Sequence, residues 1–214
     1  MEHVYSFNYI FKLMQSFYDS KVNDYMFIKH NNTLYLPEGV IGKVHDESKE
    51  EYHLLYYKYS KHQMLEAYQP FLGWIPELYN RFFEEETPEE FVKNAGVYPL
   101  MRSSFAQYIR AGKAKRTEDI LLNEISYESK KVLESLGNIY KYISSKVKLF
   151  VVIENFHLAS LSGIKALHRF LSVQFDGNLK VFGTYNESYH VFEYVEKEWH
   201  SFIETIEKQN YQFE

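Results

Sequence analysis

Residues 149–159 read Leu-Phe-Val-Val-Ile-Glu-Asn-Phe-His-Leu-Ala, a short apolar run that ends in an acidic residue. The five apolar residues before Glu154 predict a buried strand of a parallel sheet, because such strands are covered on both faces. Glu154 would end this strand, where a carboxylate can bind Mg²⁺ on a nucleotide and a second acidic group can orient the attacking water. Asn155 stands where that second group would be, and an amide cannot act as a base. This substitution raises the question whether the chain is a nucleotide hydrolase or the remains of one.

The composition predicts a folded domain with an aromatic core. The 214 residues are 45% hydrophobic, enough for one substantial core, and include 20 Tyr and 17 Phe. The net charge of −5 gives no basic field, so we expect no direct nucleic-acid binding. Cysteine is absent, which excludes disulfides, thiolate metal sites and cysteine nucleophiles.

The N-terminus and the hydropathy pattern indicate no targeting or membrane segment. The first residues lack the basic start and apolar core of a signal peptide. No apolar run approaches the roughly 20 residues that span a bilayer. We therefore expect a cytoplasmic protein that does not bind membranes.

Helical and extended patterns alternate along the chain, as in a parallel sheet covered by helices. Apolar periodicity predicts helices near residues 9–17, 64–83, 117–145, 164–171 and 193–208. Extended stretches are predicted at residues 26–30, 33–36, 54–59, 149–153 and 179–185. Thr87-Pro88-Glu89-Glu90 predicts a helix start with a capping box, and Ser160 or Ser162 can cap another helix.

The order of these elements resembles the nucleotide-binding domain of the signal-transduction ATPases with numerous domains (STAND), a branch of the AAA-type P-loop NTPases. Family members carry a hydrophobic strand followed by Asp-Asp-x-His-x-Ala-Asp, and residues 153–160, Ile-Glu-Asn-Phe-His-Leu-Ala-Ser, keep the histidine and alanine. A later family strand ends in Gly-Thr-Tyr, matched by Gly183-Thr184-Tyr185. The resemblance covers nearly the whole chain. It implies a three-layer α/β P-loop fold with a mostly parallel sheet of four to five strands, in which the strand before the phosphate loop is central.

The phosphate loop of the family is degenerate in this chain. Glycines let backbone N–H groups face the phosphates, a lysine reaches the terminal phosphates, and a Ser or Thr hydroxyl binds magnesium. Aligned on Gly42-Lys43, the chain has Pro37 in place of the first glycine and Val44 in place of the hydroxyl residue. Pro37 offers no N–H and Val44 no oxygen. Gly39 lies one position from the family's middle glycine.

The resemblance implies a nucleotide site without a catalytic residue, composed of Gly39, Gly42, Lys43, Glu154, Asn155 and Thr184. Glu154 would be the magnesium ligand, and the implied cofactor is ATP or ADP with magnesium; the alternative is no cofactor. Thr184 would sense the terminal phosphate or simply close a strand end. We also expect the Glu154 carboxylate within a few ångströms of Lys43, where the two charges compensate one another's desolvation.

Two further features have both a functional and a structural interpretation. His157 could orient a phosphate or a loop, but we favour a structural histidine held by a backbone partner. A basic cluster could contact phosphates or a partner, although a solvated loop is the favoured interpretation; it comprises Arg102, Arg110, Lys113, Lys115 and Arg116.

We therefore predict a single P-loop-like domain over residues 1–214, the N-terminal fragment of a larger signalling or transcription-control protein, with residues 210–214 beginning a further strand. The predicted function is that of a regulatory domain, nucleotide-binding or formerly so, with weak or no ATP hydrolysis. Its partners would be further domains of the same protein or partner proteins. Two alternatives stay open: a protein-protein interaction scaffold without a ligand, and an ATPase completed by a partner subunit.

Overall fold

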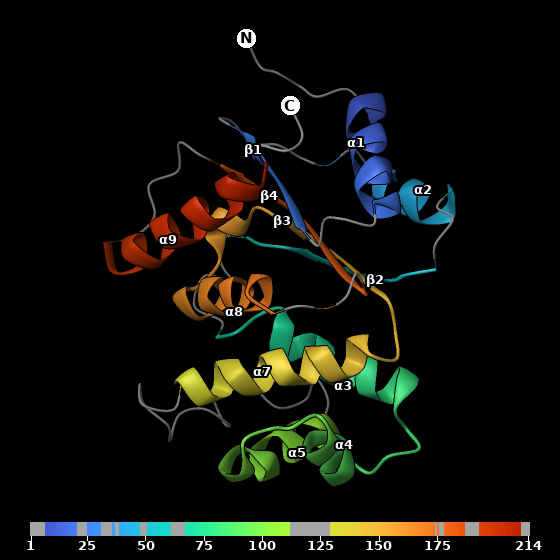
Figure 1. The fold of residues 1–214 in the computed structure, drawn as a ribbon, viewed down its shortest axis with the longest axis vertical. Coiled ribbons are helices and arrows are strands. Elements are labelled where there is room, and N and C mark those ends of the chain that lie inside the picture. Colours follow the sequence, from blue (N-terminus) through green and yellow to red (C-terminus); the bar gives the residue numbers. More distant parts are fainter. Residues whose placement is uncertain are drawn as a thin grey trace. The chain divides into compact units, whose positions relative to one another are not determined.

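The computed structural model describes residues 7–20, 25–30, 36, 39–47, 51–60, 67–111, 129–173, 175, 178–186 and 193–210. The chain forms two compact units (Figure 1). Unit 1 comprises Met1–Met64, Lys148–Ala159 and Phe175–Glu214, and unit 2 comprises Leu65–Val147 and Ser160–Gln174. The single domain expected over residues 1–214 stays a prediction.

Unit 1 contains a parallel sheet that has four strands within the described residues, in the order β1-β4-β3-β2. The strands are β1 (Tyr25–His30), β2 (His53–Lys58), β3 (Leu149–Glu154) and β4 (Leu179–Asn186). Every residue of β3 is buried, which explains its continuous apolar sequence. The predicted α/β class and parallel sheet are confirmed.

The strand expected directly before the phosphate loop, at residues 33–36, is described only at Leu36, so its predicted central position stays a prediction. Strand β1, which matches the extended stretch predicted at residues 26–30, lies at an edge of the described sheet, and β4 separates it from β3. The two strands with the longest buried stretches, β3 and β4, take the centre, whereas β1 carries the exposed Lys29. Residues 33–35 lie outside the described part of the chain. So do residues 211–214 of the expected last strand, and Asn210 belongs to a helix.

Helices cover both faces of this sheet and give unit 1 three layers (Figure 1). Helices α1 (Phe7–Asp19) and α2 (Val40–Glu47) bury their apolar faces in one cluster with strand residues Met26, Phe150, Val152 and Phe182. Helix α9 (Glu193–Asn210) covers the opposite face, where Phe202 packs edge-on against Phe27 with ring centroids 5.4 Å apart. The three-layer prediction is thus met within this unit.

Gly183 on β4 is required by the packing of that opposite face. A Cβ atom at this position would overlap the ring of Phe27, its register partner on β1. Glycine therefore has a structural reason in the Gly-Thr-Tyr segment, independent of any ligand.

Lys180 on β4 anchors the end of α1, although only 1% of the residue is exposed. Its Nζ donates hydrogen bonds to the carbonyl oxygens of Phe17, at 2.7 Å, and of Ser20. Nζ also lies 5.3 Å from the ring centroid of Phe17. Because the last carbonyls of a helix lack partners within it and carry partial negative charge, a buried ammonium is stabilised there.

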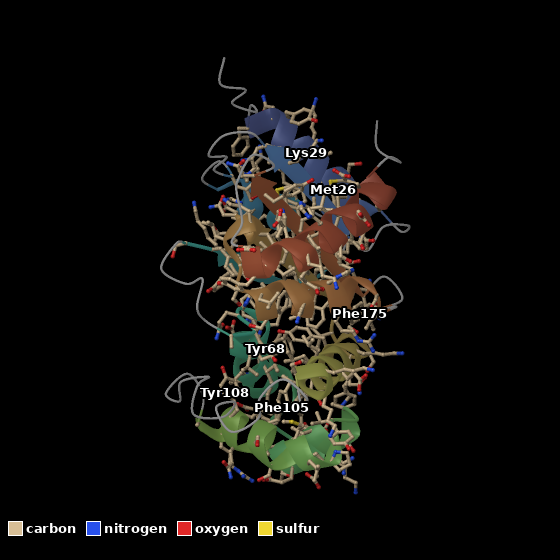
Figure 2. The ribbon with its side chains drawn as sticks, turned by 90° about the vertical axis from the view of Figure 1, so that its left-hand side faces the viewer. Met26, Lys29, Tyr68, Phe105, Tyr108 and Phe175 are labelled. Carbon is tan, nitrogen blue, oxygen red and sulfur yellow. The ribbon has the colours of Figure 1, made fainter. Side chains whose placement is uncertain are left out.

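Unit 2 is helical within the described residues. Its helices are α3 (Phe71–Phe82), α4 (Pro88–Asn94), α5 (Arg102–Ala111), α7 (Ser129–Ser144) and α8 (Leu161–Leu171), with the short 3₁₀ turn η2 (Pro99–Met101). Phe105 and Tyr108 lie on the buried face of α5 (Figure 2). The predicted capping box is present, since Thr87 Oγ1 accepts from the Glu90 N–H and the Glu90 carboxylate accepts from the Thr87 N–H.

The core of unit 2 is aromatic, as the composition predicts. Phe170 lies 4.6 Å from the ring centroids of both Phe71 and Tyr140. The buried Tyr140 hydroxyl donates to the Phe71 carbonyl at 2.8 Å. Ser160 caps α8 by accepting from the Gly163 N–H at 3.1 Å, as expected. Among the described helices, none combines the length and the apolar character needed to cross a bilayer.

Candidate functional site

The carboxyl ends of β3 and β4 bring three of the predicted site residues together. Glu154 ends β3, and Asn155 follows in the left-handed region with a φ of 58°. The Asn155 N–H donates to Oγ1 of the fully buried Thr184 on the neighbouring strand, at 3.1 Å. Asparagine adopts the left-handed region more readily than most residues other than glycine, and here it turns the chain so that three predicted site residues meet at one strand edge. This strand edge is therefore the candidate site.

Glu154 is 2% exposed, and its carboxylate accepts hydrogen bonds from donors of the protein itself. The Tyr56 hydroxyl donates to Oε1 at 2.5 Å, and the Leu36 N–H donates to Oε2 at 3.3 Å. Lys58 Nζ lies 3.6 Å from Oε2. Tyr56 and Lys58 alternate along β2 and so share one face, which brings both to the same carboxylate.

These contacts decide whether a metal ion fits at Glu154. Burial, together with the hydrogen bond to Glu154, raises the pKa of Tyr56 well above its ordinary range, so that its hydroxyl stays a donor. Lys58 supplies the positive charge that a buried carboxylate needs. A magnesium ion would have to displace Lys58 to bind Glu154. The residues present therefore do not fit the magnesium ligand that the resemblance implies.

Lys43 does not pair with Glu154, which corrects the sequence expectation. Its Nζ lies 3.7 Å from Oε1 of Glu47, one turn later in α2. It also lies 4.7 Å from the ring centroid of Phe11 and 5.6 Å from that of Phe7, both on α1. The Lys43 side chain is 47% exposed. The lysine therefore contacts α1 on the outside of the unit, while Glu154 is buried.

The reason is that Gly42 and Lys43 belong to α2 and not to a loop before it. The helix begins at Val40, directly after Gly39, whose φ of 78° favours glycine. The Lys43 N–H donates to the Gly39 carbonyl at 2.9 Å, the first hydrogen bond of the helix. Among the described residues, the N–H groups of residues 40–42 consequently have no helical partner. Such groups can bind an anion.

Packing does not explain glycine at position 42. Apart from the neighbouring residues in the chain and the backbone of the helix itself, no described atom lies within 4 Å of a Cβ built on Gly42 or on Gly39. Glycine inside a helix costs roughly 0.5–1 kcal/mol relative to alanine. By contrast, Val44, where the family has a hydroxyl, is fully buried in the core cluster of unit 1 and has a structural role. Pro37 lies outside the described residues.

His157 has the backbone partner that the structural interpretation predicts. Its Nδ1 accepts a hydrogen bond from the Asn186 N–H at 3.0 Å. Its ring lies edge-on to that of His30, with centroids 5.9 Å apart. Burial and the neighbouring His30 lower the pKa of His157 to about 4, so the imidazole is neutral near pH 7. His157 therefore offers no positive charge to a phosphate.

The basic cluster has ordinary partners where the structure describes it. Arg102 Nε donates to the Val97 carbonyl at 3.0 Å, and Arg110 forms an ion pair with Glu89. Lys113, Lys115 and Arg116 lie outside the described residues.

Sequence reasoning missed Tyr56 and Lys58. Their alternation in the stretch 54–59 is a visible signal, but their role depends on the register that places Lys58 opposite Glu154. That register becomes known only from the structure.

Within the described part of the chain, no group of three or more His, Asp or Glu residues is placed to hold a metal ion. No family model, curated protein or solved structure matches this chain. The STAND resemblance thus rests on the sequence motifs and stays a prediction.

Proposed function

We propose that this chain is a regulatory domain on a nucleotide-binding α/β scaffold that binds ATP or ADP without hydrolysing ATP. It acts through conformation and through contacts with further domains of the same protein or with partner proteins. The observation that carries the proposal is the Glu154 carboxylate, which ends a central strand but is neutralised by Lys58 and bonded by Tyr56.

Three features support the absence of turnover. Glu154 is compensated by an internal cation, so magnesium has no open carboxylate at the strand end. Asn155 supplies an amide where a base would be needed. Val44 supplies no magnesium-binding oxygen and is buried in the core.

The start of α2 supports phosphate binding. Its first N–H groups lack helical partners, the backbone at Gly39 and Gly42 is open, and Lys43 is near enough in sequence to add a positive charge. In this proposal the phosphates meet Gly39, Gly42 and Lys43, and Asn155 and Thr184 would take part from the ends of β3 and β4. Because Lys58 and Tyr56 already contact the Glu154 carboxylate, it is not free to bind magnesium, and we expect ADP binding that does not depend on magnesium.

Calorimetric titration with ADP, in magnesium and in EDTA, tests this proposal. We expect binding in both conditions, with dissociation constants that agree within about twofold, a difference of under 0.5 kcal/mol. A tenfold or greater loss of affinity in EDTA would contradict it. No binding in either condition would favour the scaffold without a ligand.

The matched variants Gly42→Ala and Gly137→Ala separate the nucleotide site from the fold. Both replace a helical glycine without a close clash, since a Cβ at Gly137 would make only ordinary contacts. Each should raise helix stability by up to about 1 kcal/mol. Only Gly42→Ala should weaken ADP binding, because its methyl group covers the open backbone. Equal binding by both variants would remove the start of α2 from the site.

A further inference from the structure

Lys43 lies against a pair of aromatic rings on α1. Phe7 and Phe11 are one helical turn apart, with ring planes inclined by 10° and centroids 6.2 Å apart. The Lys43 Nζ is within 6 Å of both centroids, at 4.7 Å from Phe11 and 5.6 Å from Phe7. This is the range in which a cation is attracted to a ring face. The Lys43 Nζ also forms an ion pair with Glu47, whose Oε1 lies 3.7 Å away.

These contacts compete with any role of Lys43 at a phosphate. One ammonium cannot rest on the α1 rings and also reach the start of α2. Lys43 is the only Lys or Arg of α2. Helical side chains lean toward the N-terminus of their helix, and this one is half-exposed. It can therefore turn from the rings to the start of α2 without a change in the backbone.

We propose that Phe7 and Phe11 form a holding site for Lys43 that restrains nucleotide binding, an autoinhibitory contact between α1 and α2. This inference rests on the proposed function. Nucleotide phosphate draws Lys43 away from the rings, and release of the nucleotide restores the contact. The coupling between the two events is reciprocal. A partner that binds Phe7 and Phe11 and displaces Lys43 therefore raises the affinity for nucleotide. Lys43 therefore covers Phe7 and Phe11 when the nucleotide site is empty and leaves them when nucleotide is bound.

The double variant Phe7→Leu/Phe11→Leu tests the holding site by calorimetry with ADP in EDTA. Leucine keeps apolar bulk but removes the ring faces. We expect affinity to rise about 3- to 30-fold, as the loss of two exposed cation–ring contacts predicts. Phe11→Leu alone should give a smaller rise, and it replaces the double variant if that protein does not fold. Tyr9→Leu, on the same helix, should leave affinity unchanged.

A second measurement follows Lys43 directly. In the wild type, ring currents should shift the NMR signals of its ε-methylene protons upfield, and ADP should remove that shift. Unchanged ADP affinity in the Phe variants, or a shift that persists with ADP bound, would overturn the holding site and leave the proposed function intact. No ADP binding by the wild type or by any variant would overturn both. ADP binding by the Phe variants but not by the wild type would support the holding site and would contradict the proposed ADP binding by the wild type.

Discussion

Lys58 on β2 and Glu154 on β3 are register partners, and Lys58 Nζ lies 3.6 Å from Oε2 of Glu154. The Lys58 side chain is 39% exposed, whereas the Glu154 side chain is 3% exposed. A partly exposed lysine on the edge strand β2 thus neutralises a buried carboxylate on β3. A site that resembles a magnesium-binding strand end is thus neutralised within the chain.

The variant Lys58→Met tests that neutralisation. It leaves the Glu154 carboxylate buried without its cation, and the free energy of unfolding should fall by about 1–3 kcal/mol, a value below that of a fully buried pair because Lys58 is partly exposed. Chemical denaturation provides the measurement. In the double variant Lys58→Met/Glu154→Gln, most of the loss should be recovered. A Lys58→Met protein as stable as the wild type would show that the pair contributes nothing.

Lys180→Met should loosen the end of α1. The substitution removes the donor to the Phe17 and Ser20 carbonyls, and a buried polar group without a partner costs about 1–3 kcal/mol. Hydrogen exchange should accelerate in α1 before other helices. Lys197→Met, at an exposed position of α9, is the matched control. Unchanged exchange in α1 would contradict the anchoring role.

Gly183→Ala should destabilise unit 1 through the Phe27 ring. Overpacking of this kind costs about 1–3 kcal/mol in the free energy of unfolding. Adding Phe27→Leu should recover part of the loss, because the smaller side chain leaves room for the methyl group. If Gly183→Ala is neutral, glycine at this position has another cause.

Protonation of His157 should lower the free energy of unfolding in acid. Its pKa is about 4 in the folded protein and 6.5 in an ordinary environment, so the unfolded chain binds the proton more tightly. The contribution is complete above pH 6.5 and is lost as the pH falls toward 4, where protonation at Nδ1 would break the bond from Asn186. Thermal unfolding from pH 7 to 4 should show a shallower decline in His157→Asn than in the exposed-site control His200→Asn. Equal slopes would exclude His157 as the cause.

Local signals in the sequence predicted most elements of the sheet unit and the helix caps. Apolar runs located β3 and β4, and the Thr87 and Ser160 caps follow from backbone chemistry over three residues. Long-range pairings could not be read in this way. The edge position of β1 depends on which strands are most deeply buried in the sheet, a property of the whole unit. The partner of Lys43 depends on where α2 begins, and the partner of Glu154 depends on the register between β2 and β3.

ATP turnover in the presence of Mg²⁺ tests the central claim most directly. Phosphate release should be measured for the wild type, for Lys43→Ala, and for Asn155→Ala as a second site variant. The account predicts that all three release phosphate at the same rate as buffer, because among the described residues of the site Glu154 is already paired with Lys58 and Asn155 cannot act as a base. Steady magnesium-dependent release by the wild type that is lost in Lys43→Ala would contradict it.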